Sequence, residues 1–269
     1  MPKRIAILAN GPQTEPPRHI AELVSPGFQA ELVKPAVTRH PLTPFDSFLS
    51  DYGFVEAAMR AAAGGADAIL ISSYSDSGLD AARSALGIPV VGAGQAVLAM
   101  ARRLGNRFSI VTVWPDLFAG MYRDHLRRNG VEAQCASIRY VHGPEVLDRL
   151  GTPDSMTQQM VRGESEIIAA IIAQCAEAIR DDGADTIVFG CTCMGPVVPQ
   201  VAAACRAPVL EGSRIGYLET EALLRLGLGQ SKIAFPTPKA ASLALIQGAL
   251  AAGGDAVEEC PVCVFDAAE

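Results

Sequence analysis

The chain has 269 residues, 49% hydrophobic and only 6% aromatic, with a formal net charge of −7. This length can bury a substantial core in one large domain or two modest ones. No block of Lys or Arg runs along the sequence, and nucleic acids and anionic membranes recognise clustered basic side chains, so neither is expected as a partner.

Short β-branched runs alternate with Ala- and Leu-rich stretches of helical period, which is typical of an α/β fold with parallel sheets built from β-α-β units. The predicted strands are residues 4–9, 29–34, 68–72, 89–91, 107–113, 131–137, 186–190 and 208–210. The predicted helices are residues 53–63, 77–86, 94–104, 116–129, 158–181, 197–205, 213–225 and 238–252. Residues 35–52 contain Pro35, Pro41 and Pro44 and are predicted to form an irregular loop.

One strand segment of the chain occurs twice. Gly65–Ser73 returns 118 positions later as Gly183–Cys191, so Ser73 is the counterpart of Cys191. The repeat predicts two equivalent lobes with a ligand site at the strand ends between them. We expect the first lobe to comprise residues 1–95 plus 212–269 and the second to comprise residues 96–211.

The sequence begins with a predicted strand, and no apolar stretch approaches the roughly 18 residues of a membrane span. We therefore expect a cytoplasmic protein. Its seven cysteines, an odd number without the pattern of a small disulfide scaffold, are expected to be reduced. Cys260 and Cys263 have redox or zinc spacing, but no second pair or histidine lies nearby, so packing on an edge strand is favoured.

Cys191 is the first candidate for chemistry. It ends an apolar strand and precedes Thr192 and Cys193 at a predicted turn into a helix. Backbone N–H groups and the positive end of a helix lower a thiol pKa from about 8.5 toward neutrality, which suits an acid, base or nucleophile. A buried cysteine that serves as a small hydrophobe is the alternative. For Cys193 we favour packing over a second thiol in the site, because the turn breaks the strand alternation.

The other copy of the strand is followed by a polar run that contains Ser73, Tyr74 and Ser75. Hydroxyls and turn amides there suit a carboxylate or carbonyl oxygen, although ordinary turn and N-cap chemistry explains the same residues. His142, in a predicted loop, is either a general base or a solvated side chain. Trp114 and Tyr122 either line a ligand site or form a buried aromatic wall.

These motifs resemble the aspartate/glutamate/hydantoin racemase superfamily, and within it the hydantoin racemase branch. The likeness is carried by Asp76–Arg83, Pro89–Gly92, Phe108–Thr112 and Phe189–Met194 and extends over most of residues 1–225. It implies two pseudo-symmetric lobes, each with a mainly parallel sheet flanked by helices, that enclose a small carboxylate or cyclic imide. It also implies two cysteines on opposite faces of a substrate carbon, which move its proton without a metal or organic cofactor.

Carried onto this chain, the second of these cysteines is Cys191, and Ser73 stands where the first belongs. We also expect the substrate to be bound by polar side chains at or just after the ends of predicted strands, namely Asn10, Tyr74, Ser75, Thr112, Thr192 and Glu211. Two of these depart from the family pattern. Asn10 is the only expected donor that remains in an early loop, and Glu211 precedes Gly212 where Asp-Gly is usual.

The serine changes the expected chemistry, because an alcohol is a far weaker acid than a thiol. We therefore favour an enzyme with Cys191 as its single catalytic thiol, acting on a hydantoin-like ring or a related small carboxylate as a lyase or hydrolase. Decarboxylation, as in the arylmalonate decarboxylase branch, and hydrolysis or sulfide release both fit. An isomerase, namely a hydantoin or amino-acid racemase with Ser73 as the second acid/base, is one alternative, and a catalytically inactive binding protein is the other. Whether copies of the chain associate is left open.

Overall fold

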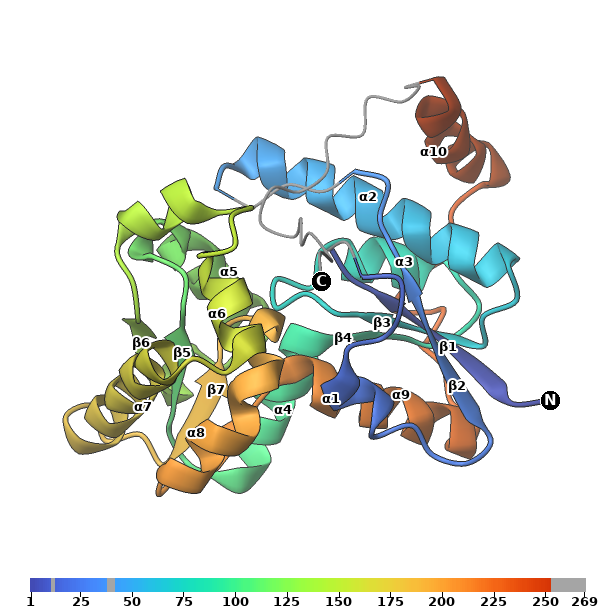
Figure 1. Ribbon diagram of the computed structural model, residues 1–269. Helices are drawn as coiled ribbons and strands as arrows, with labels where there is room; N and C mark the ends of the chain where they lie inside the picture. Colours follow the sequence, from blue (N-terminus) through green and yellow to red (C-terminus); the bar gives the residue numbers. More distant parts are fainter. Residues whose placement is uncertain (11–12, 38–41, 253–269) are drawn as a thin grey trace. The chain divides into compact units, whose positions relative to one another are not determined.

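Two parallel four-stranded sheets carry the fold of the chain in a computed structural model (Figure 1). The structure describes residues 1–10, 13–37 and 42–252. Cys260 and Cys263, for which an edge strand is predicted, lie outside these residues. The predicted fold class, two α/β lobes with parallel sheets flanked by helices, is confirmed.

The first sheet has the strand order β2-β1-β3-β4, and every neighbouring pair is parallel. Its strands are β1 (Lys3–Leu8), β2 (Phe28–Val33), β3 (Ala68–Ile71) and β4 (Val90–Gly92), and the helices of this part are α1 (Arg18–Ala21), α2 (Pro44–Ala63) and α3 (Leu79–Ala85). Apolar side chains of β1 and β3 form one buried cluster with α2 and α3, whose members include Leu8, Phe54, Ile69 and Leu79. Burial on both faces explains why these strands are continuous apolar runs.

The chain returns to the first sheet after its excursion into the second. The side-chain amide of Gln230 accepts the N–H of Val90 at 2.8 Å and donates to the carbonyl of the same residue at 3.0 Å, so it occupies the outer edge of β4. The Lys232 ammonium donates to the carbonyls of Arg83 and Ser84 at 2.7 and 2.9 Å, at the C-terminal end of α3. An ammonium at this end of a helix satisfies carbonyls that have no partner within the helix. The chain then continues into α10 (Ala240–Ala252).

The second sheet repeats the same topology in the order β6-β5-β7-β8, again with parallel pairs only. Its strands are β5 (Phe108–Thr112), β6 (Cys135–Tyr140), β7 (Thr186–Phe189) and β8 (Val209–Leu210). Its helices are α4 (Ala93–Leu104), α5 (Ala119–Arg128), α6 (Met156–Arg162), α7 (Ser165–Arg180), α8 (Val198–Ala204) and the first turn of α9 (Gly212–Leu226), with 3-10 helices η1 (Asp116–Phe118), η2 (Glu132–Gln134), η3 (Pro144–Arg149) and η4 (Thr192–Val197). β3 and β7 hold equivalent places, as the repeat predicts.

The described residues fall into two compact units. The first contains Met1–Ser72, Asp76–Gly92 and the residues from Gly216 on, and the second contains Ser73–Ser75 and Ala93–Ile215. The borders expected from the sequence, between residues 95 and 96 and between residues 211 and 212, stay predictions. The short segment Ser73–Ser75, which directly follows the first sheet, is grouped with the second unit.

Residues 44–52 form helix rather than the predicted loop. Thr43 caps α2: its hydroxyl accepts the N–H of Asp46 at 3.2 Å, and the Asp46 carboxylate accepts the N–H of Thr43 at 3.0 Å. Pro44 fills the first helical position, where its missing N–H costs nothing. A proline taken as a loop signal is here part of a helix start, so α2 begins nine residues before its predicted start.

The predicted helix 158–181 is two helices, α6 and α7. Gly163 ends α6 in a left-handed conformation with φ of 68°, which glycine adopts without strain. The predicted strand 131–137 lies later than expected, because residues 132–134 form η2 and β6 begins at Cys135. Within the described parts of the chain, no helix has the length and apolar character needed to cross a membrane.

Candidate functional site

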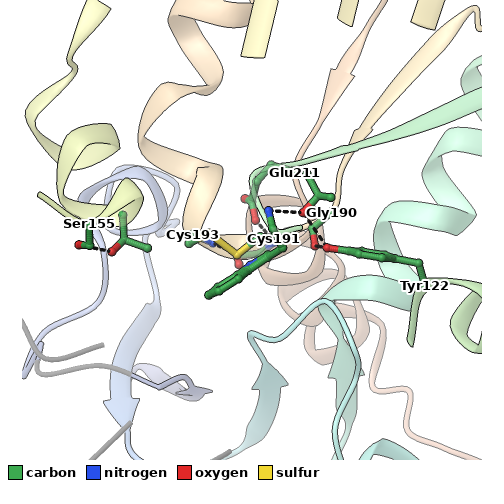
Figure 2. Close-up of a disulfide and its surroundings, with 10 residues drawn as sticks. Tyr122, Ser155, Gly190, Cys191, Cys193 and Glu211 are labelled. Carbon is green, nitrogen blue, oxygen red and sulfur yellow. Dashed lines mark hydrogen bonds between the residues drawn. A yellow bond between two sulfur atoms is a disulfide. The ribbon is translucent and has the colours of Figure 1, made fainter. Parts of the chain in front are cut away.

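The turn after β7 places Cys191 at the start of η4. Its backbone is extended, and its Sγ accepts the N–H of Cys193 at 3.1 Å. Sγ of Cys191 is bonded to Sγ of Cys193 in a disulfide, with the two Cα atoms 5.2 Å apart (Figure 2). Both residues are half-buried. The expectation of reduced cysteines, and of a packing role for Cys193, is therefore wrong for this pair, because the tight turn of η4 brings the second sulfur back to the first.

A chain of buried hydrogen bonds holds the residue before Cys191. The Tyr122 hydroxyl donates to the carbonyl oxygen of Gly190 at 2.9 Å (Figure 2). It also contacts the Thr112 hydroxyl at 2.7 Å. Thr112 in turn accepts the N–H of Trp114 at 3.2 Å. The direction is set at both ends, because a carbonyl only accepts and a backbone N–H only donates. The proton of Thr112 therefore points to Tyr122, and burial, by raising the pKa of Tyr122, keeps its donating proton in place.

Gly190 is glycine because its surroundings leave no room for a side chain. A Cβ there would lie 2.9 Å from Cγ2 of Ile110, 2.9 Å from Cβ of Thr112 and 3.0 Å from Cε1 of Tyr122. Such distances are shorter than ordinary carbon contacts, so any larger residue would displace this strand end. The last carbonyl before Cys191 is thus fixed by packing as well as by hydrogen bonding.

The segment Ser73–Ser75 reaches this network through Tyr74. The Tyr74 ring is buried, with its centroid 5.4 Å from the Tyr122 ring and 5.2 Å from the His125 ring. The hydroxyls of Ser73 and Ser75 lie 2.9 Å apart. A series of contacts through Tyr74, Tyr122 and Gly190 therefore connects the counterpart serine to the turn that carries Cys191.

His125 is a neutral, buried member of this cluster that the sequence did not indicate. Burial lowers its pKa to about 4, and a hydrogen bond with the backbone of Gly94 opposes the shift only in part. A Cβ on Gly94 would collide with the backbone oxygen of Tyr74 and with Nε2 of His125. No spacing pattern in the sequence connects these three residues, which are brought together by tertiary packing alone.

Glu211, expected to bind substrate, caps the helix that follows it. Its two carboxylate oxygens accept the N–H groups of Ser213 and Arg214 at 2.8 and 3.0 Å, at the start of α9. The side chain is fully buried, and burial outweighs these hydrogen bonds and raises its pKa to about 6. The carboxyl group lies at the positive end of a helix, which opposes part of the effect of burial on its pKa.

The remaining predicted contacts differ in their surroundings. Thr192 is half-buried at the first position of η4, directly beside Cys191. Thr112 is fully buried, with its hydroxyl engaged in the network below Gly190. Asn10 follows β1 in the first unit, and its Oδ1 is buried without a hydrogen-bond partner among the described residues. All predicted site residues except Asn10 thus belong to the second unit.

Two other candidates, Trp114 and His142, have mainly structural surroundings, as does Ser155, which the sequence did not indicate. The Trp114 ring packs on Phe118 with centroids 5.2 Å apart, as part of a buried aromatic wall. His142 is half-buried after β6, and burial lowers its pKa. Ser155 caps α6, which packs on η4, and Figure 2 shows it on the side of the disulfide opposite Tyr122. Among the residues the structure describes, no three His, Cys, Asp or Glu side chains are grouped as a metal site requires.

Comparison with known proteins gives concordant matches. The family model described as Asp/Glu/Hydantoin racemase matches residues 35–219. A hydantoin racemase from Rhizobium meliloti is 30% identical over 73% of this chain and 78% of its own length, and one from Pseudomonas sp. (strain NS671) is 30% identical over 70% and 71%. The structure of allantoin racemase from Klebsiella pneumoniae is similar with a TM-score of 0.74 and 28% identity, covering 88% of this chain and 95% of its own.

Proposed function

The chain belongs to the Asp/Glu/hydantoin racemase family of enzymes. On that premise we propose that its reduced Cys191 moves a proton at the ring carbon of a hydantoin-like substrate, or at the corresponding carbon of a related small carboxylate. The observation that carries this proposal is the setting of Cys191. Its half-buried sulfur lies at the end of a buried strand, faces a backbone N–H at 3.1 Å, and follows a carbonyl fixed by Tyr122.

Proton transfer at such a carbon needs a base of moderate strength and donors for the oxyanion that forms. The ring carbon lies next to a carbonyl, so removing its proton places negative charge on the carbonyl oxygen. A hydrogen bond from the Cys193 N–H favours the thiolate over the thiol in the reduced protein, which makes the sulfur an effective base. Thr192, the next residue in the chain, carries a hydroxyl of the kind that stabilises an oxyanion.

Ser73 favours chemistry that uses one thiol. Its hydroxyl lies 2.9 Å from that of Ser75, and a neighbouring alcohol does not activate it as a base would. An enzyme with one strong acid/base protonates its carbanion from one side only. We therefore assign the chain to lyase- or hydrolase-type reactions in which Cys191 acts alone. The second candidate is racemisation with Ser73 as the other acid/base, and it is favoured by the hydantoin and allantoin racemases among the relatives.

The test is incubation of the protein, kept reduced with dithiothreitol, with 5-substituted hydantoins, thiohydantoins, allantoin and arylmalonates in deuterated water. One labelled enantiomer with loss of carbon dioxide indicates decarboxylation, ring opening or sulfide indicates hydrolysis, and label in both enantiomers indicates racemisation. General acid/base groups contribute about 100- to 10,000-fold to rate, so Cys191→Ala should lower turnover by at least about 100-fold.

Two variants separate the alternatives. Ser73→Cys restores a thiol at the counterpart position and should increase label in the second enantiomer. Cys205→Ala removes a half-buried thiol that is not part of the turn and serves as the control, with unchanged turnover. If Cys191→Ala keeps full turnover, Cys191 is not the acid/base. If the unaltered protein binds these compounds but turns none of them over, the alternative of an inactive binding protein is correct.

A further inference from the structure

The Cys191–Cys193 disulfide uses the sulfur that the proposed function needs. In this form the sulfur of Cys191 carries no proton and cannot accept one. We propose that the two cysteines form a reversible oxidation site, in which a peroxide oxidises Cys191 and Cys193 converts the product to the disulfide. Its effect on turnover depends on the proposed function, whereas the oxidation site itself depends only on the geometry of the pair.

A purely structural role for this disulfide is disfavoured by its small ring. Only Thr192 separates the two cysteines, and a disulfide constrains the unfolded chain less as the loop that it closes becomes shorter. The strands on which the turn rests are already secured by burial, since Ile110, Val188 and Phe189 are fully buried. Both cysteines are also half-buried rather than enclosed, so a small oxidant or reductant can reach the bond.

A second cysteine pair in the same unit gives a useful comparison. The thiols of Cys175 and Cys205 are within hydrogen-bond distance of each other, yet both are free. Cys175 is fully buried, and burial raises the pKa of its thiol, which disfavours the thiolate that oxidants attack. Closeness of two thiols is therefore not sufficient for a disulfide in this protein. What distinguishes Cys191 and Cys193 is closeness together with access and a stabilised sulfur.

Hydrogen bonding indicates which sulfur reacts first. The N–H of Cys193 points at Sγ of Cys191 at 3.1 Å, and the same donor stabilises the Cys191 thiolate when the bond is open. Redox-sensing cysteines are typically accessible thiolates that lie beside a resolving cysteine. Cys191 fits the first role, and Cys193, two residues later in the tight turn, fits the second.

The oxidation of Cys191 and its conversion to the disulfide take two steps. The Cys191 thiolate attacks one oxygen of a peroxide, an S–O bond forms as the O–O bond breaks, and the leaving hydroxide takes a proton to become water. The sulfur loses two electrons and the peroxide gains them. Sγ of Cys193 then attacks Sγ of Cys191, the S–O bond breaks, and the leaving hydroxide departs as water with the Cys193 thiol proton. A dithiol reductant restores both thiols by thiol–disulfide exchange and is itself oxidised to a disulfide.

The test is mass spectrometry of the full-length protein, reduced with dithiothreitol, freed of it, and then exposed to hydrogen peroxide in several-fold molar excess, because each oxygen atom added to a sulfur consumes one peroxide. We expect the protein to lose two hydrogen atoms, a proteolytic peptide to contain a disulfide between residues 191 and 193, and dithiothreitol to restore the reduced mass in full. In Cys193→Ser the intermediate has no resolving thiol, so Cys191 should instead gain two or three oxygen atoms that dithiothreitol does not remove. Cys193→Ala provides a second form of this variant, and Cys205→Ser is the matched control that should behave as the unaltered protein.

Two outcomes would overturn the oxidation site: persistent oxygen addition at Cys191 in the unaltered protein, or a reversible response in Cys193→Ser and Cys193→Ala equal to that of the unaltered protein. Turnover is measured on the same samples and should fall at least about tenfold on oxidation, because the thiol supplies a 100-fold or larger effect. A reduced protein without turnover that still forms the 191–193 link contradicts only the proposed function. Undiminished turnover of the linked form shows that the oxidation does not switch the enzyme.

Discussion

Replacing Tyr122 with Phe tests whether its hydroxyl holds the end of β7. The substitution keeps the ring, and with it the packing on Tyr74, but removes the donor to Gly190 and the acceptor for Thr112. The carbonyl of Gly190 and the hydroxyl of Thr112 both remain buried. The perturbation is therefore confined to two hydrogen bonds and the groups that they satisfied.

The expected magnitude follows from those two groups. A buried polar group left without its partner costs about 1–3 kcal/mol. Two groups lose a buried partner, and the Thr112 hydroxyl can rotate, so we place the total loss in the free energy of unfolding at about 2–4 kcal/mol. Turnover should also fall, because the carbonyl released by the substitution directly precedes Cys191.

Urea unfolding of the reduced protein measures the loss. Tyr140→Phe is the matched control: Tyr140 is half-buried with its ring centroid 6.4 Å from that of Tyr122, and among the described residues its hydroxyl has no hydrogen bond. That variant should change stability by less than about 0.5 kcal/mol. Thr112→Val completes a double-mutant cycle with Tyr122→Phe, and the two losses should fall short of additivity by about 1 kcal/mol because they remove one shared bond.

Tyr122 does not hold the end of β7 if the free energy of unfolding of Tyr122→Phe lies within about 0.5 kcal/mol of that of the unaltered protein and turnover is unchanged. The same conclusion follows if the two substitutions are strictly additive, since independent sites behave in that way. A loss of similar size in Tyr140→Phe would assign the effect to the phenol environment in general rather than to the bond with Gly190.

Three further predictions concern the same unit. The folded-state pKa of His125, about 4, lies below its ordinary 6.5, so its contribution to the free energy of unfolding is complete above pH 6.5, and about 3 kcal/mol is lost as the pH falls through 4. His125→Gln should remove this pH dependence from the stability measured by urea unfolding. Glu211 acts with the opposite sign: its folded-state pKa of about 6 exceeds the ordinary 4.5, so a stabilisation of about 2 kcal/mol is present below pH 4.5 and is lost as the pH rises through 6. The free energy of unfolding of the unaltered protein minus that of Glu211→Gln should therefore fall over this range, and a constant difference contradicts the assignment. Gly190→Ala should destabilise the protein by about 1–3 kcal/mol, because the new Cβ is crowded by its neighbours. The control Gly120→Ala, in a helix with open space around the new Cβ, should be neutral or stabilising in thermal unfolding, and equal effects of the two substitutions would exclude crowding as the cause.

The strands were predictable from sequence because buried parallel strands leave a local trace. Residues 68–71 are an apolar run, and residues 186–189, 118 positions later, are apolar after Thr186; they form β3 and β7 at equivalent places in two sheets of identical order. That repeat alone identified Ser73 and Cys191 as counterparts. Helix boundaries were harder to predict where one residue type occurs both in loops and at helix ends. Pro44 begins α2, and Gly163 ends α6.

The contacts of the candidate site depend instead on side chains far apart in the sequence. The hydroxyl of Tyr122 meets the carbonyl of Gly190 across 68 positions, and Tyr74 joins both to His125. Hydrophobic periodicity reports which face of an element is buried, but not which partner it meets there. The composition and repeat of this chain therefore predict its two parallel sheets and identify the strand ends that are counterparts in the two sheets. The hydrogen bonds behind Cys191, the capping role of Glu211 and the bond to Cys193 arise only when packing brings those groups within reach of one another.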